Sequence, residues 1–127
     1  MAAKMKQAFQ EFCEDIFVTA VEGGIDYWFI YTPHTYDPDL GRIEGTPYGE
    51  EEPVVINLAV VWAGVNSLIA LGDDLPNKLE GTPVGNLARL LEHHDAEGWL
   101  PDVLNIIDAA DADYIVQYGL FGDLVYG

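Results

Sequence analysis

The chain has 127 residues, half of them apolar, and its 22 acidic side chains outnumber the five basic ones to give a formal net charge of −17. This length and apolar content suffice for one domain with a sizeable core, covering residues 1–127, and argue against a disordered acidic tail. The charge argues against direct binding of nucleic acid, because phosphates repel so negative a surface.

Apolar side chains between Met5 and Ala20 recur at helical spacing with acidic side chains on the opposite face. This pattern predicts an amphipathic helix over residues 3–21. The pair Gly23-Gly24 ends that helix, and the aromatic and β-branched residues 25–32 predict a strand that is covered on both faces. Beyond a loop, residues 42–44 are expected to pair back as a short edge strand.

Residues 53–72 contain no ionisable side chain and approach the length of a membrane span. Polar residues inside the run, and acidic flanks without nearby lysine or arginine, argue against a span. We therefore interpret the run as a buried strand over residues 54–56 and a buried helix over residues 58–71. Asn57 is the expected N-cap of this helix and Gly72 its C-terminal stop.

The C-terminal half reads as a series of helices followed by a strand. Thr82-Pro83 predicts the start of a helix to about residue 95, and residues 101–107 predict another short one. Asp111 is expected to cap a last helix over residues 112–121, with residues 123–126 as a terminal strand. The whole order predicts an α+β fold, a small and mainly antiparallel sheet of three or four strands packed by four or five helices.

Two segments, residues 15–28 and 112–127, resemble the ends of small uncharacterised acidic proteins encoded by tailed phages, especially those of actinobacteria. The resemblance implies a phage origin and a role in the cytoplasm of the infected host, and it carries no activity, cofactor or catalytic residue. The single cysteine, Cys13, cannot form an internal disulfide, which also fits a reducing cytosol.

Histidines provide the candidates for metal binding or catalysis. His93 and His94 with Asp95 could bind zinc, but adjacent residues on a helix point about 100° apart and do not converge. Alternatively, these histidines complement the dipole at a helix C-terminus. His34, in a loop rich in aspartate, could assist acid-base chemistry or simply lie in a solvated turn. A small metal-dependent enzyme using these histidines therefore stays an alternative, and we expect no cofactor.

The remaining candidates for chemistry have simpler structural explanations. Cys13 stands beside Glu14, which would raise the pKa of a thiol, and Ser67 lies inside the apolar helix without a nucleophile motif. The Gly23-Gly24 turn followed by Asp26, Tyr27 and Trp28 could line a ligand pocket, with Glu22 and Asp26 as paired carboxylates. A helix stop that leads into a buried aromatic strand explains the same residues. The sequence therefore favours a protein that is not an enzyme.

The acidic residues are spread along the whole chain, as phosphates are along a nucleic acid. We expect them to mimic phosphates and to bind a basic protein surface, that of a nucleic-acid-binding host protein such as a defence or DNA-processing enzyme. The expected partner-binding residues are Glu50, Glu51, Glu52, Asp73, Asp74, Asp108, Asp111 and Asp113, with Tyr48 or Trp99 as an aromatic anchor. Two alternatives stay open: acidity that only keeps the protein soluble, and an accessory homo-oligomer paired through residues 25–31 or the terminal strand.

Overall fold

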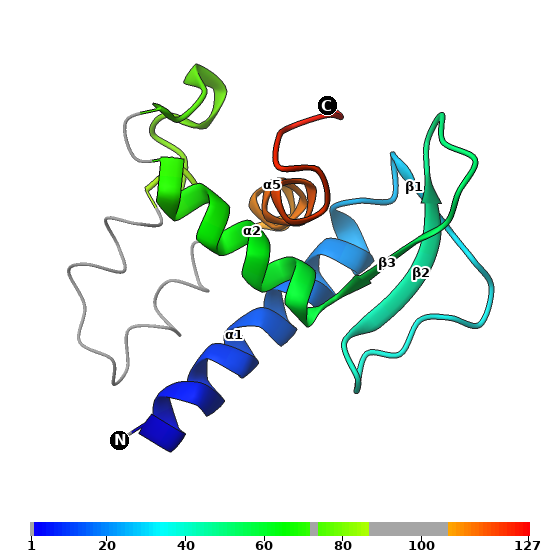
Figure 1. Ribbon diagram of the computed structural model, residues 1–127, viewed down its shortest axis with the longest axis horizontal. Helices are drawn as coiled ribbons and strands as arrows, with labels where there is room; N and C mark the ends of the chain where they lie inside the picture. Colours follow the sequence, from blue (N-terminus) through cyan, green and yellow to red (C-terminus); the bar gives the residue numbers. More distant parts are fainter. Residues whose placement is uncertain (1, 72–73, 87–106) are drawn as a thin grey trace.

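The computed structural model describes residues 2–71, 74–86 and 107–127, and in this part of the chain three α-helices pack against a three-stranded antiparallel sheet (Figure 1). The elements are α1 (Ala2–Gly23), β1 (Phe29–Tyr31), β2 (Arg42–Pro47), β3 (Val54–Asn57), α2 (Leu58–Leu71), the 3-10 helix η2 (Asn77–Leu79) and α5 (Ala109–Phe121). The α+β class is confirmed, with fewer elements than expected. The helices predicted over residues 82–95 and 101–107 lie largely outside the described residues.

The sheet has the order β1-β2-β3, so β2 is its central strand. Phe29 pairs with Pro47 on one side of β2, and Ile43 pairs with Ile56 on the other. Residues 42–44 were predicted to form a short strand at the edge of the sheet. They belong instead to the central strand, so this prediction is wrong. The extended stretch continues to Pro47, which gives β2 enough length to bond two neighbours. Alternate residues of β2 point into the core and outward, as expected for a sheet with one covered face.

The strand predicted over residues 25–32 is mostly a turn. After α1 ends, the amide of Phe29 donates to the carbonyl of Ile25 at 2.9 Å, and strand pairing begins only at Phe29. In β1 the side chain of Ile30 is 63% exposed, so the expectation of a strand covered on both faces is wrong. Aromatic and β-branched content favours extended backbone, but it does not determine which residues are buried.

The apolar run forms the predicted strand and helix. Asn57 caps α2, its Oδ1 accepting the amide of Val60 at 3.0 Å. The helix buries one face and crosses α5 with very close backbones: a Cβ on Gly64 would lie 1.9 Å from the Ile115 carbonyl oxygen, and one on Gly119 2.0 Å from that of Val60. Among the described residues, none of the helices has the length and apolar character that a membrane crossing requires.

The N-cap of the last helix, α5, lies three residues before the predicted cap. Asp108 is the N-cap: its Oδ1 accepts the Asp111 amide at 2.9 Å, while Asp111 Oδ2 accepts the Asp108 amide at 3.1 Å. This reciprocal capping box places Asp111 inside the helix as its third residue, which corrects its expected role as the cap. Gly122 ends the helix in the left-handed region, with φ of 70°.

The segment after α5 also departs from the prediction. Residues 123–126 were expected to form a strand, but they take no regular structure. Their amide groups at Val125 and Tyr126 both donate to Oε1 of Gln117 instead. A side chain of α5 therefore satisfies the backbone that a neighbouring strand was expected to satisfy.

Candidate partner-binding site

A buried polar network lies between α5 and the turn that precedes β1. Asp113 accepts three hydrogen bonds: at Oδ1 from Trp28 Nε1 (2.7 Å) and from Gln117 Nε2 (2.9 Å), and at Oδ2 from the Tyr27 hydroxyl (2.6 Å). Asp113 is only 3% exposed and Gln117 is fully buried. Burial, and then the hydrogen bond to Asp113, raises the pKa of the Tyr27 phenol. Asp113 was expected to face a partner; the structure instead places it in the interior.

This network also holds the aromatic rings behind the sheet. The ring of Tyr126 stacks on Trp28, with the centroids 5.0 Å apart and the planes 5° from parallel. Phe121 packs edge-on against Trp28 at 5.7 Å. Because the Trp28 indole is also bonded to Asp113, its position is set both by packing and by a directional hydrogen bond.

Residues 48–52, which we call the acidic turn, connect β2 and β3 directly above these rings. The amide of Tyr48 donates to the carbonyl of Trp28 at 2.6 Å, and its carbonyl accepts the Tyr126 hydroxyl at 2.8 Å. The amide of Glu50 closes the turn onto Pro47 at 3.0 Å. The acidic turn is thus bonded to the buried network at its first residue, Tyr48, through both the amide and the carbonyl of that residue.

The side chains of the acidic turn point into solvent. Tyr48 is 69% exposed, and Glu50, Glu51 and Glu52 are all exposed. Gly49 has φ of 84°, a conformation that glycine adopts without strain, and it lets the chain reverse at this point. Four of the predicted partner-binding residues therefore share one fixed turn, with an aromatic ring next to three carboxylates.

The other predicted partner-binding residues are distributed differently. Asp74 and Asp108 are exposed, whereas Asp73 and Trp99 lie outside the described residues. Asp111 is 3% exposed, so its expected role on the surface is wrong. Its Oδ1 faces the Val84 amide at 3.4 Å, which links the start of α5 to the preceding turns.

The capping box separates the acidities of its two carboxyls. Burial raises the pKa of Asp111 to about 6. The pKa of Asp108 is lowered, chiefly because its carboxylate accepts the Asp111 amide. A carboxyl that is buried and nearly neutral at mildly acidic pH is a structural feature of the helix start, and it cannot act as a phosphate mimic.

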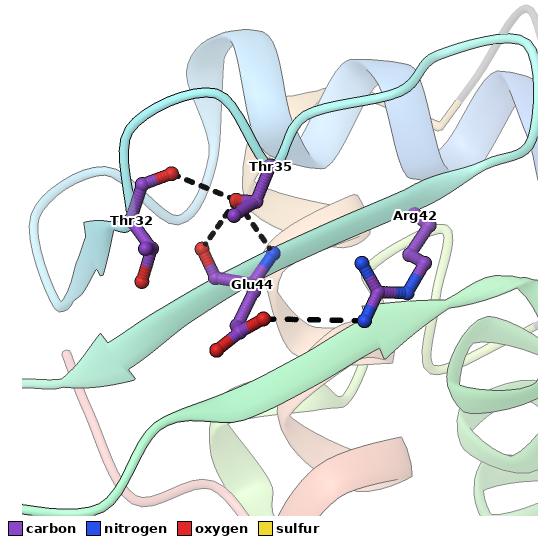
Figure 2. Close-up of polar contacts among 4 residues, drawn as sticks. All are labelled: Thr32, Thr35, Arg42 and Glu44. Atoms are coloured by element: carbon purple, nitrogen blue, oxygen red, sulfur yellow. Dashed lines mark hydrogen bonds and ion pairs between the residues drawn. The ribbon is translucent and has the colours of Figure 1, made fainter.

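The described cations do little to neutralise the surface. Arg42 approaches Glu44 across 3.9 Å, a long and solvent-exposed ion pair (Figure 2). Lys78 donates from Nζ to the main-chain oxygen of Gly127 at 2.5 Å and lies 5.5 Å from the ring centre of Tyr114. Exposed pairs of this kind contribute little, so the surface carboxylates keep most of their field.

Protein-family models, curated proteins and solved structures give no match to this chain. The function is therefore argued from the geometry of the acidic turn and its supports.

Of the catalytic and metal candidates, His34 is the one that the structure describes. It is exposed, with φ of 67°, in the loop between β1 and β2. Thr35 next to it fastens this loop, its hydroxyl lying 2.8 Å from the carbonyl of Thr32 and 3.0 Å from the amide of Glu44 (Figure 2). Within the described ranges no three His, Cys, Asp or Glu side chains group to hold a metal. The candidates His93, His94 and Asp95 fall outside them.

The alternative of a ligand pocket near Gly23-Gly24 corresponds to a real cavity. It has a volume of about 410 Å³, and its lining includes Asp26, Tyr27, Lys78 and Tyr114. Sequence reasoning proposed the first two and missed Lys78, which reaches the cavity from the segment after α2. The ammonium of Lys78 donates one hydrogen bond to the main-chain oxygen of Gly127, which also lines this cavity.

Cys13 is buried in the core, as its position on the apolar face of α1 suggested. Burial, and to a smaller degree Glu14, raises the pKa of its thiol to about 11. At neutral pH the thiol is therefore protonated and poorly nucleophilic.

Proposed function

We propose that this chain is an acidic binding protein without enzymatic activity, whose carboxylates take the place of nucleic-acid phosphates on a basic protein surface. The partner is a nucleic-acid-binding protein, and the sequence resemblance suggests a phage-encoded inhibitor of a host defence or DNA-processing enzyme, acting in the host cytoplasm. The observation that carries the proposal is the acidic turn: three adjacent exposed carboxylates that follow an exposed tyrosine, whose amide and carbonyl are both hydrogen-bonded to the buried network.

A fixed turn suits recognition for an energetic reason. Association costs free energy when flexible loops are ordered, and a loop already held in place avoids much of that cost. The Tyr48 amide donates to the Trp28 carbonyl and the Tyr126 hydroxyl donates to the Tyr48 carbonyl, and these bonds hold the start of the acidic turn before any partner arrives. Its tyrosine can then insert into a pocket of the partner, since tyrosine is among the residues that contribute most to interfaces.

The surface charge supports the same proposal. The net charge of −17 accelerates encounter with a cationic surface, and this attraction weakens as salt screens it. Arg42 and Lys78 are bonded within the protein, so a partner's lysines and arginines would meet carboxylates that internal cations barely shield. Such a contact gains mainly in association rate.

The test begins with capture of partners from host lysate on the immobilised chain at low salt. The dissociation constant of each captured protein is then measured between about 50 and 500 mM salt, with and without competing duplex DNA. We expect the affinity to fall steeply with salt and the DNA to compete for the same surface. An affinity that does not change with salt, or DNA that binds alongside the chain, contradicts phosphate mimicry.

Charge-neutral variants locate the contact. Changing residues 50–52 to glutamine should weaken binding about tenfold or more, because three adjacent charges are lost from the turn. The matched control, Asp15→Asn with Asp39→Asn and Glu80→Gln, removes the same charge from other exposed positions and should change affinity by less than about threefold. Tyr48→Ala leaves the net charge unchanged and should weaken binding of the partner about tenfold or more. Equal losses in both triple variants would show that only net charge matters.

A further inference from the structure

Residues 124–127, which we call the docked segment, fold back beside α5 after the helix ends (Figure 1). They contact α5, the rings of Trp28 and Phe121, and Lys78, and we call the surface that these residues form the groove. In strand addition, peptides are held through a sheet edge; here the contacts come from side chains. The groove therefore has the parts of a peptide-binding site, with this chain's own segment as the occupant.

The side chain of Gln117 forms hydrogen bonds with the main chain of the docked segment. Its Oε1 accepts the amides of Val125 at 2.8 Å and Tyr126 at 2.9 Å, and its Nε2 faces the Tyr126 carbonyl at 3.3 Å. Gln117 is fully buried, so the departure of the segment would leave its carbonyl without these two donors. Recognition through main-chain groups is specific for an extended peptide.

Tyr126 and Gly127 supply the side-chain specificity. The Tyr126 ring packs against both Trp28 and Phe121, which also contact each other, and its hydroxyl donates to the Tyr48 carbonyl at 2.8 Å. Gly127 has φ of 90°, and a Cβ there would lie 2.8 Å from the Tyr27 hydroxyl. The groove therefore selects a tyrosine followed by glycine.

The connection to α5 is short. Gly122, with φ of 70°, and the exposed Asp123 are the residues between the helix and the docked segment. We propose that the groove is a recognition site for an extended Tyr-Gly peptide, and that the docked segment of a second copy of this chain can fill it to give an exchanged dimer. The contacts are the same within one copy and between two. The balance between monomer and exchanged dimer therefore depends on the connecting residues Gly122 and Asp123, which we call the hinge, and on the protein concentration. This inference does not depend on the proposed function.

The hinge gives the test. Sedimentation equilibrium of the full chain should show mainly monomer up to about 0.1 mM, because a segment on a short hinge competes at an effective concentration of about millimolar. Gly122→Val strains the left-handed hinge and should tighten dimerisation about tenfold. Gly81→Val is the matched control, because Gly81 has φ of 78° and equally open space around it. This control should leave association unchanged.

Adding Tyr126→Ala to the Gly122→Val variant should restore the monomer, since the ring that fills the groove is gone. The inference is overturned if Gly122→Val associates no more tightly than the wild type up to about 1 mM. It is also overturned if the dimer persists without Tyr126. The salt dependence of partner binding is unaffected by either result, so failure here leaves the proposed function separately testable.

A peptide titration covers the case in which a hinge variant does not fold. A labelled peptide of residues 121–127 should bind the full-length Tyr126→Ala protein, and the same peptide with Gly127→Ala should bind at least about tenfold more weakly. If that protein is unfolded as well, millimolar peptide is added to the wild type. Faster hydrogen exchange at the Val125 amide then supports the groove, and unchanged exchange overturns it.

Discussion

Replacing Asp113 with alanine removes the acceptor that three donors share. Trp28 Nε1 and Gln117 Nε2 both bond its Oδ1 inside the protein, while the Tyr27 hydroxyl bonds its Oδ2 at the margin. Tyr27 is exposed and can bond water instead. The two buried donors lose that acceptor, although Gln117 Nε2 keeps its longer contact with the Tyr126 carbonyl.

The magnitude follows from those two donors. An unsatisfied buried donor costs about 1–3 kcal/mol. Trp28 Nε1 loses its acceptor, whereas Gln117 Nε2 keeps its longer contacts with the Tyr126 carbonyl and the Tyr27 hydroxyl, so Asp113→Ala should lower the free energy of unfolding by about 2–3 kcal/mol. This is a large part of the roughly 5–15 kcal/mol that stabilises a domain. Asp113→Asn keeps an oxygen for Trp28 and Gln117 and offers an amide to the Tyr27 hydroxyl. Asp113→Asn should therefore lower the free energy of unfolding by only about 1 kcal/mol.

Urea unfolding followed by far-ultraviolet circular dichroism measures both variants. Glu80→Ala, at an exposed position, is the control and should change the free energy of unfolding by less than about 0.5 kcal/mol. A loss below about 1 kcal/mol for Asp113→Ala would refute the hydrogen-bond argument. So would an equal loss in Asp113→Asn, because the negative charge, and not the acceptor oxygen, would then be the group that matters.

Three further predictions concern the core. Gly64→Ala should destabilise the fold by about 3 kcal/mol or more in the same assay, because its Cβ would meet the Ile115 carbonyl oxygen at 1.9 Å. Asn66→Ala, exposed on the same helix, should be neutral or slightly stabilising. Burial raises the pKa of Asp111 from 3.8 to about 6, so the folded chain holds that proton more tightly than the unfolded chain, and the stabilisation present below pH 3.8 is lost as pH rises through 6. Asp111→Asn removes this dependence, so its free energy of unfolding relative to the wild type should rise by about 2 kcal/mol between pH 4 and 7; parallel pH profiles would contradict the assignment. Cys13, whose pKa is raised to about 11, should react with a thiol reagent at pH 8 only after denaturant unfolds the chain, and fast labelling of the native protein would contradict its burial.

Local signals predicted several elements correctly. The strand and helix at residues 54–71, with Asn57 as the cap, follow from an apolar run with a good capping residue. The end of α5 at Gly122 follows from the freedom of glycine in the left-handed region. The prediction of a terminal strand was wrong. The amide groups of extended residues can be satisfied by a side chain such as that of Gln117 as well as by a neighbouring strand.

The site was predictable in part. Tyr48 and the three glutamates that follow stand together in the sequence, so a turn with an aromatic ring and carboxylates was visible there. Its supports were not, because Tyr48 is bonded to Trp28 and Tyr126, which lie 20 and 78 residues away along the chain. No periodicity or turn rule connects residues at such separations.

The sequence by itself determined the acidic charge, the α+β class and the caps that begin α2 and end α5, because these depend on composition and on residues a few positions apart. Only the tertiary structure decided which carboxylates are charged surface groups and which are internal acceptors. Asp113 meets Trp28, which lies 85 positions away along the chain, and that contact makes a buried carboxylate tolerable. Burial is a property of the packed chain, so Asp113 and Glu50 have the same chemistry in the sequence and opposite places in the protein.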